Sequence, residues 1–290
     1  MRERVAVIGT GAIGSPMARC LIRAGFRTTV YDIRREAVEP LVAMGAKRAE
    51  SITDCTDGDA IIIVVANDSQ VDEVVAGPGG ILNGLPQGAR PVIAVMSTVS
   101  PETVRRLGAL CRARGVEIID SPVSGGHVAA ENGNLSVMVG GTKETFERMN
   151  PVLSAIGQRL YYIGELGAGE VMKLVNNLIG VTNMFLTIEA LATGVRNGVP
   201  LDTLLSIIDT SSGSNFHTRN WPLAKAFFSD LARDIDSARN NLSLSIKDLT
   251  HAQELATLAK GPSPLLKGVI EALKEMTPEY LVDEWNDVIK

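Results

Sequence analysis

A lysine and two asparagines stand in an otherwise apolar stretch, GAGEVMKLVNN, at residues 167–177. Residues three and four apart share one face of a helix, so Lys173, Asn176 and Asn177 are predicted to form one polar spot. The apolar positions around them predict a helix that is buried nearly all round. A buried charge is costly unless it is paired or used. The alternative is a lysine whose stem is buried and whose ammonium reaches solvent.

The stretch VAVIGTGAIGSPMA places Gly9, Gly11 and Gly14 in GxGxxG spacing, after a predicted strand and before a predicted helix. In that context the first glycine permits a tight turn, the second lets a pyrophosphate approach the backbone, and the third allows close helix–strand packing. The helix N-terminus offers N–H groups to the phosphates. A plain glycine-rich turn is the alternative. The predicted cofactor contacts here are Gly9, Thr10, Gly11, Ala12, Ile13 and Gly14.

Asp32 ends the second predicted strand and favours NAD, because a carboxylate there accepts hydrogen bonds from the adenosine ribose and repels a 2′-phosphate. Arg34 and Arg35 keep NADP open, since either could pair with that phosphate.

Ligands of parallel sheets bind at the carboxyl ends of the strands, which makes polar strand ends candidates for cofactor contacts. Asn67 and Thr98 follow two such strands, and Ser100 is the more natural N-cap for the helix that begins at Pro101. Ser124, Gly125 and Gly126 follow a later strand. Their hydroxyl and consecutive N–H groups could form an anion nest for a carboxylate, although Ser-Gly-Gly alone is commonly just a turn. His127 is a weaker candidate for a base.

The elements that must position these residues fall into two halves. Short apolar runs alternate with helical stretches in the first half, which predicts a parallel sheet covered by helices on both faces. From about residue 164 helical periodicity takes over, and residues 169–196 read as one helix of roughly 40 Å. We therefore predict an α/β dinucleotide-binding domain at residues 1–163 and an all-helical substrate and oligomerisation domain at residues 164–290. The predicted strands are Val5–Ile8, Thr28–Tyr31, Ala60–Val65, Val92–Val95, Glu117–Ile119 and Leu135–Val139.

The whole-chain numbers limit the partners. The chain has 290 residues, 45% of them hydrophobic, and a net charge of -5, which argues against nucleic acid or an anionic membrane surface as the main partner. Cys20, Cys55 and Cys111 form no paired or metal-binding pattern and are expected to be buried in a reducing cytosol. The longest strongly apolar run, residues 60–66, is too short to span a bilayer, and the N-terminus leads directly into a strand. We expect a soluble cytoplasmic protein.

Four stretches in this order resemble the β-hydroxyacid dehydrogenases, the family of 3-hydroxyisobutyrate dehydrogenase and tartronate semialdehyde reductase. They are VAVIGTGAIGSPMA, DSPVSGGHVAAENGNL, GAGEVMKLVNN and IKDL (residues 246–249). The resemblance extends over essentially the whole chain. The resemblance implies a Rossmann domain joined to an all-α domain through one long helix. It also implies a 6-phosphogluconate dehydrogenase-like enzyme that transfers a hydride between NAD and a small 3-hydroxy acid or semialdehyde, without a metal. A homodimer or homotetramer is expected.

Carried onto this sequence, the resemblance makes Lys173 the catalytic lysine and Asn177 the residue that holds substrate and lysine in place. Desolvation would lower the pKa of Lys173 from about 10.4, so that it could take the hydroxyl proton as the hydride leaves. Ser124, Gly125 and Gly126 would bind the substrate carboxylate. The resemblance makes Thr98 a cofactor contact, and places Lys247, otherwise a solvated helix charge, near both nicotinamide and substrate.

Several departures from the family pattern leave the identity of the substrate open. The sequence does not fix the favoured direction or the oligomer size either. Ala129 stands where many relatives have glycine, and Ala66–Asn67 replaces a common Leu-Pro. The alternatives are an NADPH-dependent glyoxylate or semialdehyde reductase, an imine reductase, and a non-catalytic dinucleotide-binding module. Imine reductases generally lack the lysine at this point, and the intact Lys173, Asn177 and Ser-Gly-Gly loop argue against the non-catalytic module. His217, His251, Trp221 and Trp285 are expected to be packing or surface residues, although Phe216, His217 and Trp221 could line the pocket.

Overall fold

The computed structural model describes residues 3–289 of the chain. It forms two compact units, residues 1–173 and 174–290, and the chain passes from one to the other within a single helix, α8 (Ala168–Arg196). The first unit has two hydrophobic cores, one on each face of its sheet, and the second unit has one.

The first unit is built on a nine-stranded sheet, counted over residues 3–289, in the order β3-β2-β1-β4-β5-β6-β8-β7, with β9 beside β8. Strands β1 to β6 run parallel, whereas β8 runs antiparallel to β6 and β7. The strands are β1 (Arg4–Ile8), β2 (Arg27–Tyr31), β3 (Lys47–Arg48), β4 (Ala60–Ile63), β5 (Val92–Val95), β6 (Glu117–Asp120), β7 (Val123–Ser124), β8 (Leu135–Gly140) and β9 (Gly157–Gly164).

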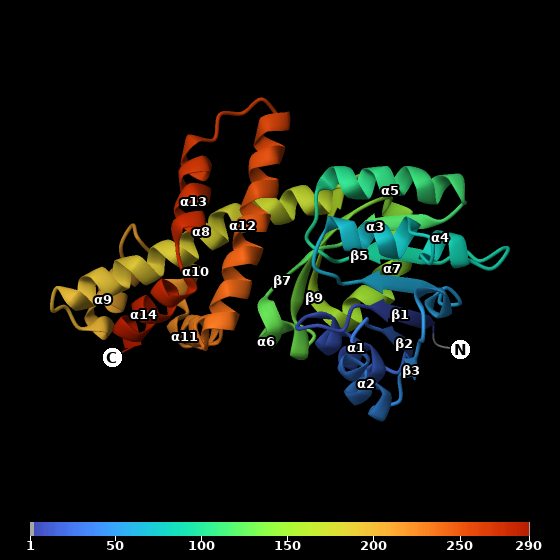
Figure 1. The fold of residues 1–290 in the computed structure, drawn as a ribbon, viewed down its shortest axis with the longest axis horizontal. Coiled ribbons are helices and arrows are strands. Elements are labelled where there is room, and N and C mark those ends of the chain that lie inside the picture. Colours follow the sequence, from blue (N-terminus) through green and yellow to red (C-terminus); the bar gives the residue numbers. More distant parts are fainter. Residues whose placement is uncertain (1–2, 290) are drawn as a thin grey trace. The chain divides into compact units, whose positions relative to one another are not determined.

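Helices cover both faces of this sheet, with α3, α4 and α5 on one side and α1, α2 and α7 on the other (Figure 1). The helices of this unit are α1 (Gly14–Arg23), α2 (Glu39–Ala43), α3 (Asp68–Ala76), α4 (Ile81–Gly84), α5 (Pro101–Ala113), α6 (Gly126–Glu131) and α7 (Lys143–Ile156), with 3₁₀ turns η1 (Arg35–Ala37) and η2 (Ile52–Cys55).

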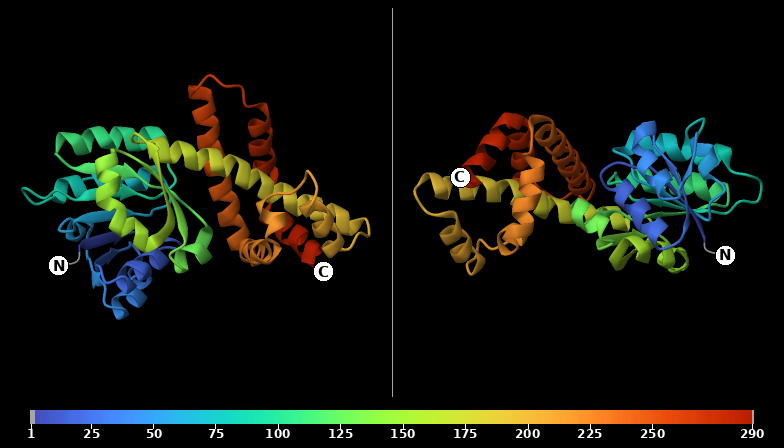
Figure 2. Two further views of the ribbon diagram at one scale, coloured as in Figure 1. Left: turned by 180° about the vertical axis from the view of Figure 1, so that it is seen from behind. Right: turned by 90° about the horizontal axis from the view of Figure 1, so that it is seen from below.

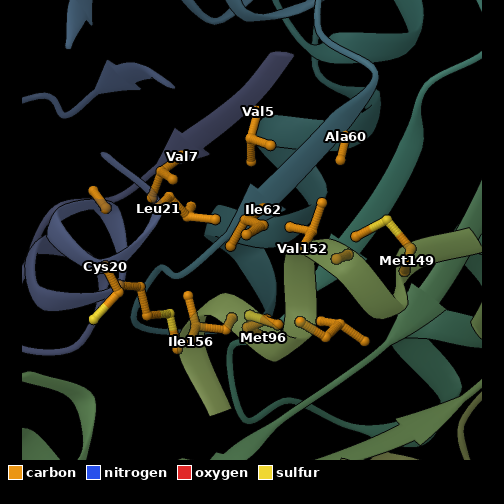
Figure 3. Packing of buried hydrophobic residues seen from close by; sticks show 14 of the residues in the cluster. Val5, Val7, Cys20, Leu21, Ala60, Ile62, Met96, Met149, Val152 and Ile156 are labelled. Carbon is orange, nitrogen blue, oxygen red and sulfur yellow. The ribbon is translucent and has the colours of Figure 1, made fainter. Parts of the chain in front are cut away.

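The continuous apolar strands follow from this two-sided burial. In β1, Val5 and Val7 belong to the core under α1 and α7, whereas Ala6 and Ile8 belong to the core under α3 and α5. Successive side chains of a strand point to opposite faces, so a strand covered on both sides is apolar throughout. Figure 3 shows one of these cores, in which β1 and β4 residues pack against Leu21 of α1 and against α7.

The structure differs from the sequence prediction at the far edge of the sheet. The sheet is mixed, because β8 reverses direction after the chain has passed through β7 and α6. The prediction that the strand beginning at Ala60 reaches Val65 is wrong, since β4 ends at Ile63. The edge strand β9 was not predicted, because all but the first of its residues are at least partly exposed and it lacks the alternation of a half-buried strand.

The second unit is all-helical, as predicted, and α12 packs on both α13 and α14 (Figures 1 and 2). Its core is formed by apolar residues of α8, α9, α11, α12, α13 and α14. The helices after α8 are α9 (Leu201–Asp209), α10 (Phe216–Arg219), α11 (Trp221–Leu231), α12 (Ile235–Leu258), α13 (Pro264–Glu275) and α14 (Pro278–Ile289).

The prediction that the helix around Lys173 is buried nearly all round is wrong. Leu174 is fully buried, but Val175 and Ile179 are 44% and 60% exposed, and Lys173 itself is of intermediate exposure. By length and composition alone α8 could cross a membrane, a property that core helices of soluble proteins share. Some apolar residues of α8 therefore lie inside a core, and others lie on an exposed face of the helix.

Candidate active site

The glycine-rich turn between β1 and α1 leaves room for a dinucleotide only where the motif predicts it. Gly9 has a φ of +92°, and a Cβ there would stand 2.1 Å from the carbonyl oxygen of Val64. A Cβ on Gly14 would stand 1.9 Å from the carbonyl oxygen of Gly9. Apart from Gly11 and its two chain neighbours, by contrast, no heavy atom of the described residues lies within 4 Å of the position that a Gly11 Cβ would take. The turn is tight at two glycines and open at the third, which fits the approach of a pyrophosphate.

Asp32 is bound to the same turn. Its Oδ2 accepts hydrogen bonds from the backbone N–H of Thr10 at 2.8 Å and from its hydroxyl at 3.2 Å, and Oδ1 accepts the N–H of Arg34 at 2.9 Å. Burial acts to raise the pKa of Asp32, but the hydrogen bonds from Arg34 and Thr10 and the Arg34 charge outweigh it and lower the pKa overall. Asp32 is therefore a carboxylate at neutral pH.

Two further predicted cofactor contacts lie in loops that are joined by hydrogen bonds. Asn67 is the N-cap of α3, with its Oδ1 accepting the N–H of Gln70 at 3.0 Å, and Thr98 is half-buried after β5. Asp68 accepts the N–H of Ser100 at 2.9 Å, which links the loop after β4 to the loop after β5. The prediction that Ser100 caps α5 is confirmed, because its hydroxyl accepts the N–H of Glu102.

The Ser-Gly-Gly segment forms the turn between β7 and α6. Ser124 pairs with Ser136 of β8, and Gly125 and Gly126 have φ values of +133° and +69°, which only glycine adopts easily. A Cβ on Gly125 would stand 2.6 Å from the Cβ of Ala129. The alanine that replaces a common glycine therefore packs directly on this turn.

His127 connects this turn to the glycine-rich turn. Its Nδ1 lies 2.8 Å from the carbonyl oxygen of Ala12, and because a carbonyl only accepts, Nδ1 carries the hydrogen. Its Nε2 lies 3.5 Å from a carboxylate oxygen of Glu131, which also pairs with Arg19 of α1. The histidine therefore holds α6 beside the predicted pyrophosphate site, a positioning contact that sequence reasoning did not reveal.

In the second unit, Asn177 and Lys247 are brought together by a residue that was not singled out from the sequence. Asp248 accepts a hydrogen bond from the amide nitrogen of Asn177 at 2.7 Å through Oδ2, and its Oδ1 lies 3.2 Å from Nζ of Lys247. The amide oxygen of Asn177 accepts from Asn176 at 3.2 Å. Asp248 thus fixes the orientation of the Asn177 amide. Asp248 lies inside the IKDL motif, but the sequence of a single aspartate on a helix does not indicate which residue it contacts.

The aromatic residues of this unit form a packed cluster around His217. The His217 ring stacks on Phe228 at 5.2 Å between centroids, and Trp285 packs on Phe228 at 5.3 Å. Burial lowers the pKa of His217. The prediction that His217 and Trp285 serve in packing is confirmed by their burial, whereas Phe216 is 65% exposed.

Models of two families cover nearly the whole chain. Residues 4–164 match the NAD binding domain of 6-phosphogluconate dehydrogenase, and residues 167–288 match the NAD-binding domain of NADP-dependent 3-hydroxyisobutyrate dehydrogenase.

Individual relatives agree with these matches. The chain is 38% identical to 2-(hydroxymethyl)glutarate dehydrogenase of Eubacterium barkeri over 73% of its own length and 70% of the relative. It is 34% identical to NAD-dependent L-serine dehydrogenase of Pseudomonas aeruginosa, over 91% of this chain and 88% of that one. The crystal structure of 3-hydroxyisobutyrate dehydrogenase from Salmonella typhimurium superimposes with a TM-score of 0.81 at 26% identity, covering 97% of this chain and 99% of that chain.

Fold, glycine-rich turn and relatives define a nicotinamide-dependent oxidoreductase. The chain belongs to the β-hydroxyacid dehydrogenase family, as the sequence motifs predicted.

Proposed function

We propose that this enzyme interconverts a small 3-hydroxy acid and its semialdehyde, as a 3-hydroxyisobutyrate dehydrogenase-like enzyme, with NAD as cofactor. One observation carries the proposal. The unbroken helix α8 holds Lys173 and Asn177 one turn apart, and the amide of Asn177 is fixed by Asp248. A lysine followed one turn later by an oriented amide is suited to proton transfer at a hydroxyl group.

The residues of the first unit fit the cofactor. The turn from Gly9 to Gly14 would hold the pyrophosphate, Asp32 the adenosine ribose, and Asn67 and Thr98 would line the strand ends. When bound, the nicotinamide accepts the hydride from the alcohol carbon, or donates it in the reverse direction. Lys173 takes the hydroxyl proton during oxidation and returns it during reduction.

The carboxylate of the substrate is assigned to Ser124, to the backbone of Gly125 and Gly126, and to Lys247, which would also lie near the nicotinamide. The positive φ values at both glycines support this assignment, because such a turn presents consecutive N–H groups. Lys247 adds a positive charge, and its contact with Asp248 keeps that charge beside Asn177.

The contacts of two arginines support NAD over NADP. Arg34 Nε lies 3.4 Å from Asp32 Oδ1, and Arg35 pairs with Glu50 at 2.8 Å. Both guanidinium groups that could receive a 2′-phosphate therefore face carboxylates. A phosphate in that place would also meet the Asp32 charge.

The test is a substrate panel assayed by nicotinamide absorbance with NAD and NADP in both directions. We expect the highest kcat/KM for a short 3-hydroxy acid or its semialdehyde with NAD. A strong preference for glyoxylate with NADPH, or turnover of cyclic imines alone, would reject the assignment and favour one of the two alternative enzymes. Binding of NAD without turnover of any member would favour a non-catalytic module.

We further propose a cytoplasmic homodimer or homotetramer assembled through the second unit. Side chains of Val175, Ile179 and Leu186 on α8 are 44%, 60% and 58% exposed, and exposed apolar surface of this kind supports an interface with a second chain. Light scattering after gel filtration should give the mass of a dimer or tetramer, and Ile179→Asp with Leu186→Asp should shift it toward one chain. A wild-type monomer at micromolar concentration would contradict the proposal.

We place the boundary between the cofactor and helical domains at residues 163 and 164. The match to the first family model ends at residue 164 and the match to the second begins at residue 167, which supports this boundary. The first turns of α8 nevertheless pack within the first unit, which ends at Lys173. A fragment of residues 1–173 should therefore fold and bind NAD more readily than one of residues 1–163, as measured by thermal unfolding and fluorescence titration.

A further inference from the structure

Asp120, the last residue of β6, has a fully buried carboxylate that holds the start of α8. Oδ1 accepts the backbone N–H of Gly167 at 2.7 Å, and Oδ2 accepts that of Glu170 at 2.8 Å. The helical bonds of α8 begin here, since the N–H of Val171 donates to the carbonyl oxygen of Gly167 at 3.1 Å. The carboxylate therefore receives amides of the first turn, which have no partner inside a helix.

The sequence next to α8 supplies no side chain for this purpose. Gly167 occupies the N-cap position with a φ of +93°, so the capping group comes from Asp120, 47 to 50 residues earlier in the chain. A carboxylate at a helix N-terminus is also favoured by the helix dipole. Burial raises the pKa of Asp120, and the N–H donors from Gly167 and Glu170 limit that rise.

The first turn has no room to shift at this junction. A Cβ on Gly169 would stand 2.3 Å from the carbonyl oxygen of Met138 and 2.9 Å from Oδ2 of Asp120. A Cβ on Gly140 would stand 2.4 Å from Oδ1 of Asp120. The helix backbone therefore lies directly on β8 and on the carboxylate.

A second carboxylate anchors the same turn to the loop after β5. Oε2 of the buried Glu170 accepts the N–H of Val99 at 3.3 Å, next to the predicted cofactor contact Thr98. Lys173 follows Glu170 by three residues, so it lies about one helical turn beyond these two anchors.

We propose that Asp120 is a positioning residue of the reaction, which fixes the first turn of α8 and thereby the place of Lys173 relative to the Ser124–Gly126 turn. The inference rests on the proposed role of Lys173. Asp120 lies four residues before Ser124, so one side chain connects the turn assigned to the carboxylate with the helix that carries the lysine. Lys173 lies roughly 8 Å along the axis from the start of α8. A tilt of about 10° there would move it by more than about 1 Å, a misplacement that can cost about 100-fold in rate.

The test begins with Asp120→Asn, which keeps the volume but directs an NH₂ donor at one of the two helix amides. We expect kcat to fall roughly 10- to 100-fold. The Kd for NAD, measured by fluorescence titration, should stay within about twofold, because the dinucleotide contacts lie on other loops. Thr142→Ala is the matched control, since it removes the N-cap of α7, where the hydroxyl accepts the N–H of Thr145 at 3.1 Å. This control should lower the Tm and leave kcat unchanged.

A double-mutant cycle with Lys173→Ala separates positioning from general loss of structure. If Asp120 acts through Lys173, Asp120→Asn should change the residual kcat of Lys173→Ala by less than about threefold. Equal factors in both backgrounds would overturn the positioning role. Near wild-type kcat in Lys173→Ala alone would instead reject the proposed function of the lysine, so the two failures are distinguishable.

A measurement on the wild-type enzyme keeps the inference testable if Asp120→Asn does not fold. Hydrogen exchange of residues 168–173 should be as slow as in the middle of α5. Fast exchange, typical of a frayed helix start, would show that Asp120 does not hold the turn and would overturn the inference.

Discussion

At the scale of single residues, Lys173 is proposed to transfer the proton in the reaction. We expect Lys173→Ala to lower kcat by roughly 10² to 10⁴, the usual range for a general acid–base group. NAD binding should be retained, because the dinucleotide contacts are on the strand ends and the glycine-rich turn. Steady-state kinetics together with a fluorescence titration of NAD measure both effects. A variant with wild-type turnover would remove the lysine from the mechanism.

Asp32 should make the preference for NAD insensitive to pH across the working range. Its pKa is lowered, so the carboxylate is ionised above its unfolded value of 3.8 and the stability it contributes is lost only as the pH falls through the lower folded value. The 2′-phosphate of NADP is doubly charged above pH of about 6. The ratio of kcat/KM for NAD and NADP should therefore stay constant from about pH 7 to 9.

Replacement of this carboxylate is the complementary test. Asp32→Asn should narrow the NAD preference by roughly 10- to 150-fold, the range of one charge-assisted hydrogen bond. A ratio that changes tenfold with pH in the wild type, or an unchanged ratio in Asp32→Asn, would show that another group reads the ribose.

Functional residues could be predicted from the sequence where they form a local motif with fixed spacing. They could not be predicted where their hydrogen-bond partner is far away along the chain. The GxGxxG spacing and Asp32 are local patterns, and the structure brings them together through Thr10. Asp120 and Asp248 were missed, because their partners are 50 and 71 residues away. A lone aspartate has no periodicity that could reveal such a partner.

At the scale of elements, Ser124–Gly126 in the β7–α6 turn and Lys247 on α12 are proposed to bind the substrate carboxylate. If they form one anion site, the enzyme should prefer a hydroxy acid over the same alcohol with its carboxylate amidated. The expected ratio in kcat/KM is about 10- to 150-fold, because a hydrogen bond to a charged group contributes roughly 1.5 to 3 kcal/mol.

Two variants measure how much the turn and how much α12 contribute to the preference for the acid over its amide. Lys247→Ala should narrow it strongly, whereas Ser124→Ala should narrow it less, since the N–H groups of Gly125 and Gly126 remain. Equal efficiency on acid and amide in the wild type would show that the turn binds something else, and the hydroxy acid assignment would fail.

The helices and strands could be predicted where burial produces a regular pattern of apolar residues in the sequence. Strands β1, β2, β4, β5, β6 and β8 lie within two residues of their predicted ends, since helices cover both faces of the sheet. Strand β9 carries exposed Tyr161 and Tyr162 at 48% and 41% and shows no such pattern. The two-residue strand β7 and the six-residue helix α6 are too short for periodicity to reveal.

At the scale of the whole molecule, the reactivity of the buried cysteines measures whether the first unit is folded. Cys55 and Cys111 are fully buried, and burial raises the pKa of each thiol to about 12. Only about one thiol in 10⁴ would then be ionised at pH 8. We expect both to resist a disulfide reagent at pH 8 in the native enzyme and to react fully in denaturant.

At a fixed pH, the reaction rate with this reagent should therefore follow unfolding of the first unit. The matched variant Cys20→Ala removes the third thiol, so that the signal belongs to the two buried groups. Rapid labelling of native protein at pH 7 would contradict their burial.

The cap that Asp120 provides has a consequence for the order in which the chain can fold during synthesis. The group that completes the start of α8 leaves the ribosome before α8 does, and so does β8, on which Gly169 rests. When residues 174–290 leave the ribosome, the residues that contact the first turn of α8 have therefore already been synthesised. A permuted chain that begins at residue 164 and carries residues 1–163 at its C-terminus would reverse this order. In the permuted chain α8 would be synthesised before Asp120. We therefore expect the permuted chain to refold more slowly and aggregate more than the natural chain, and to reach the same final fold.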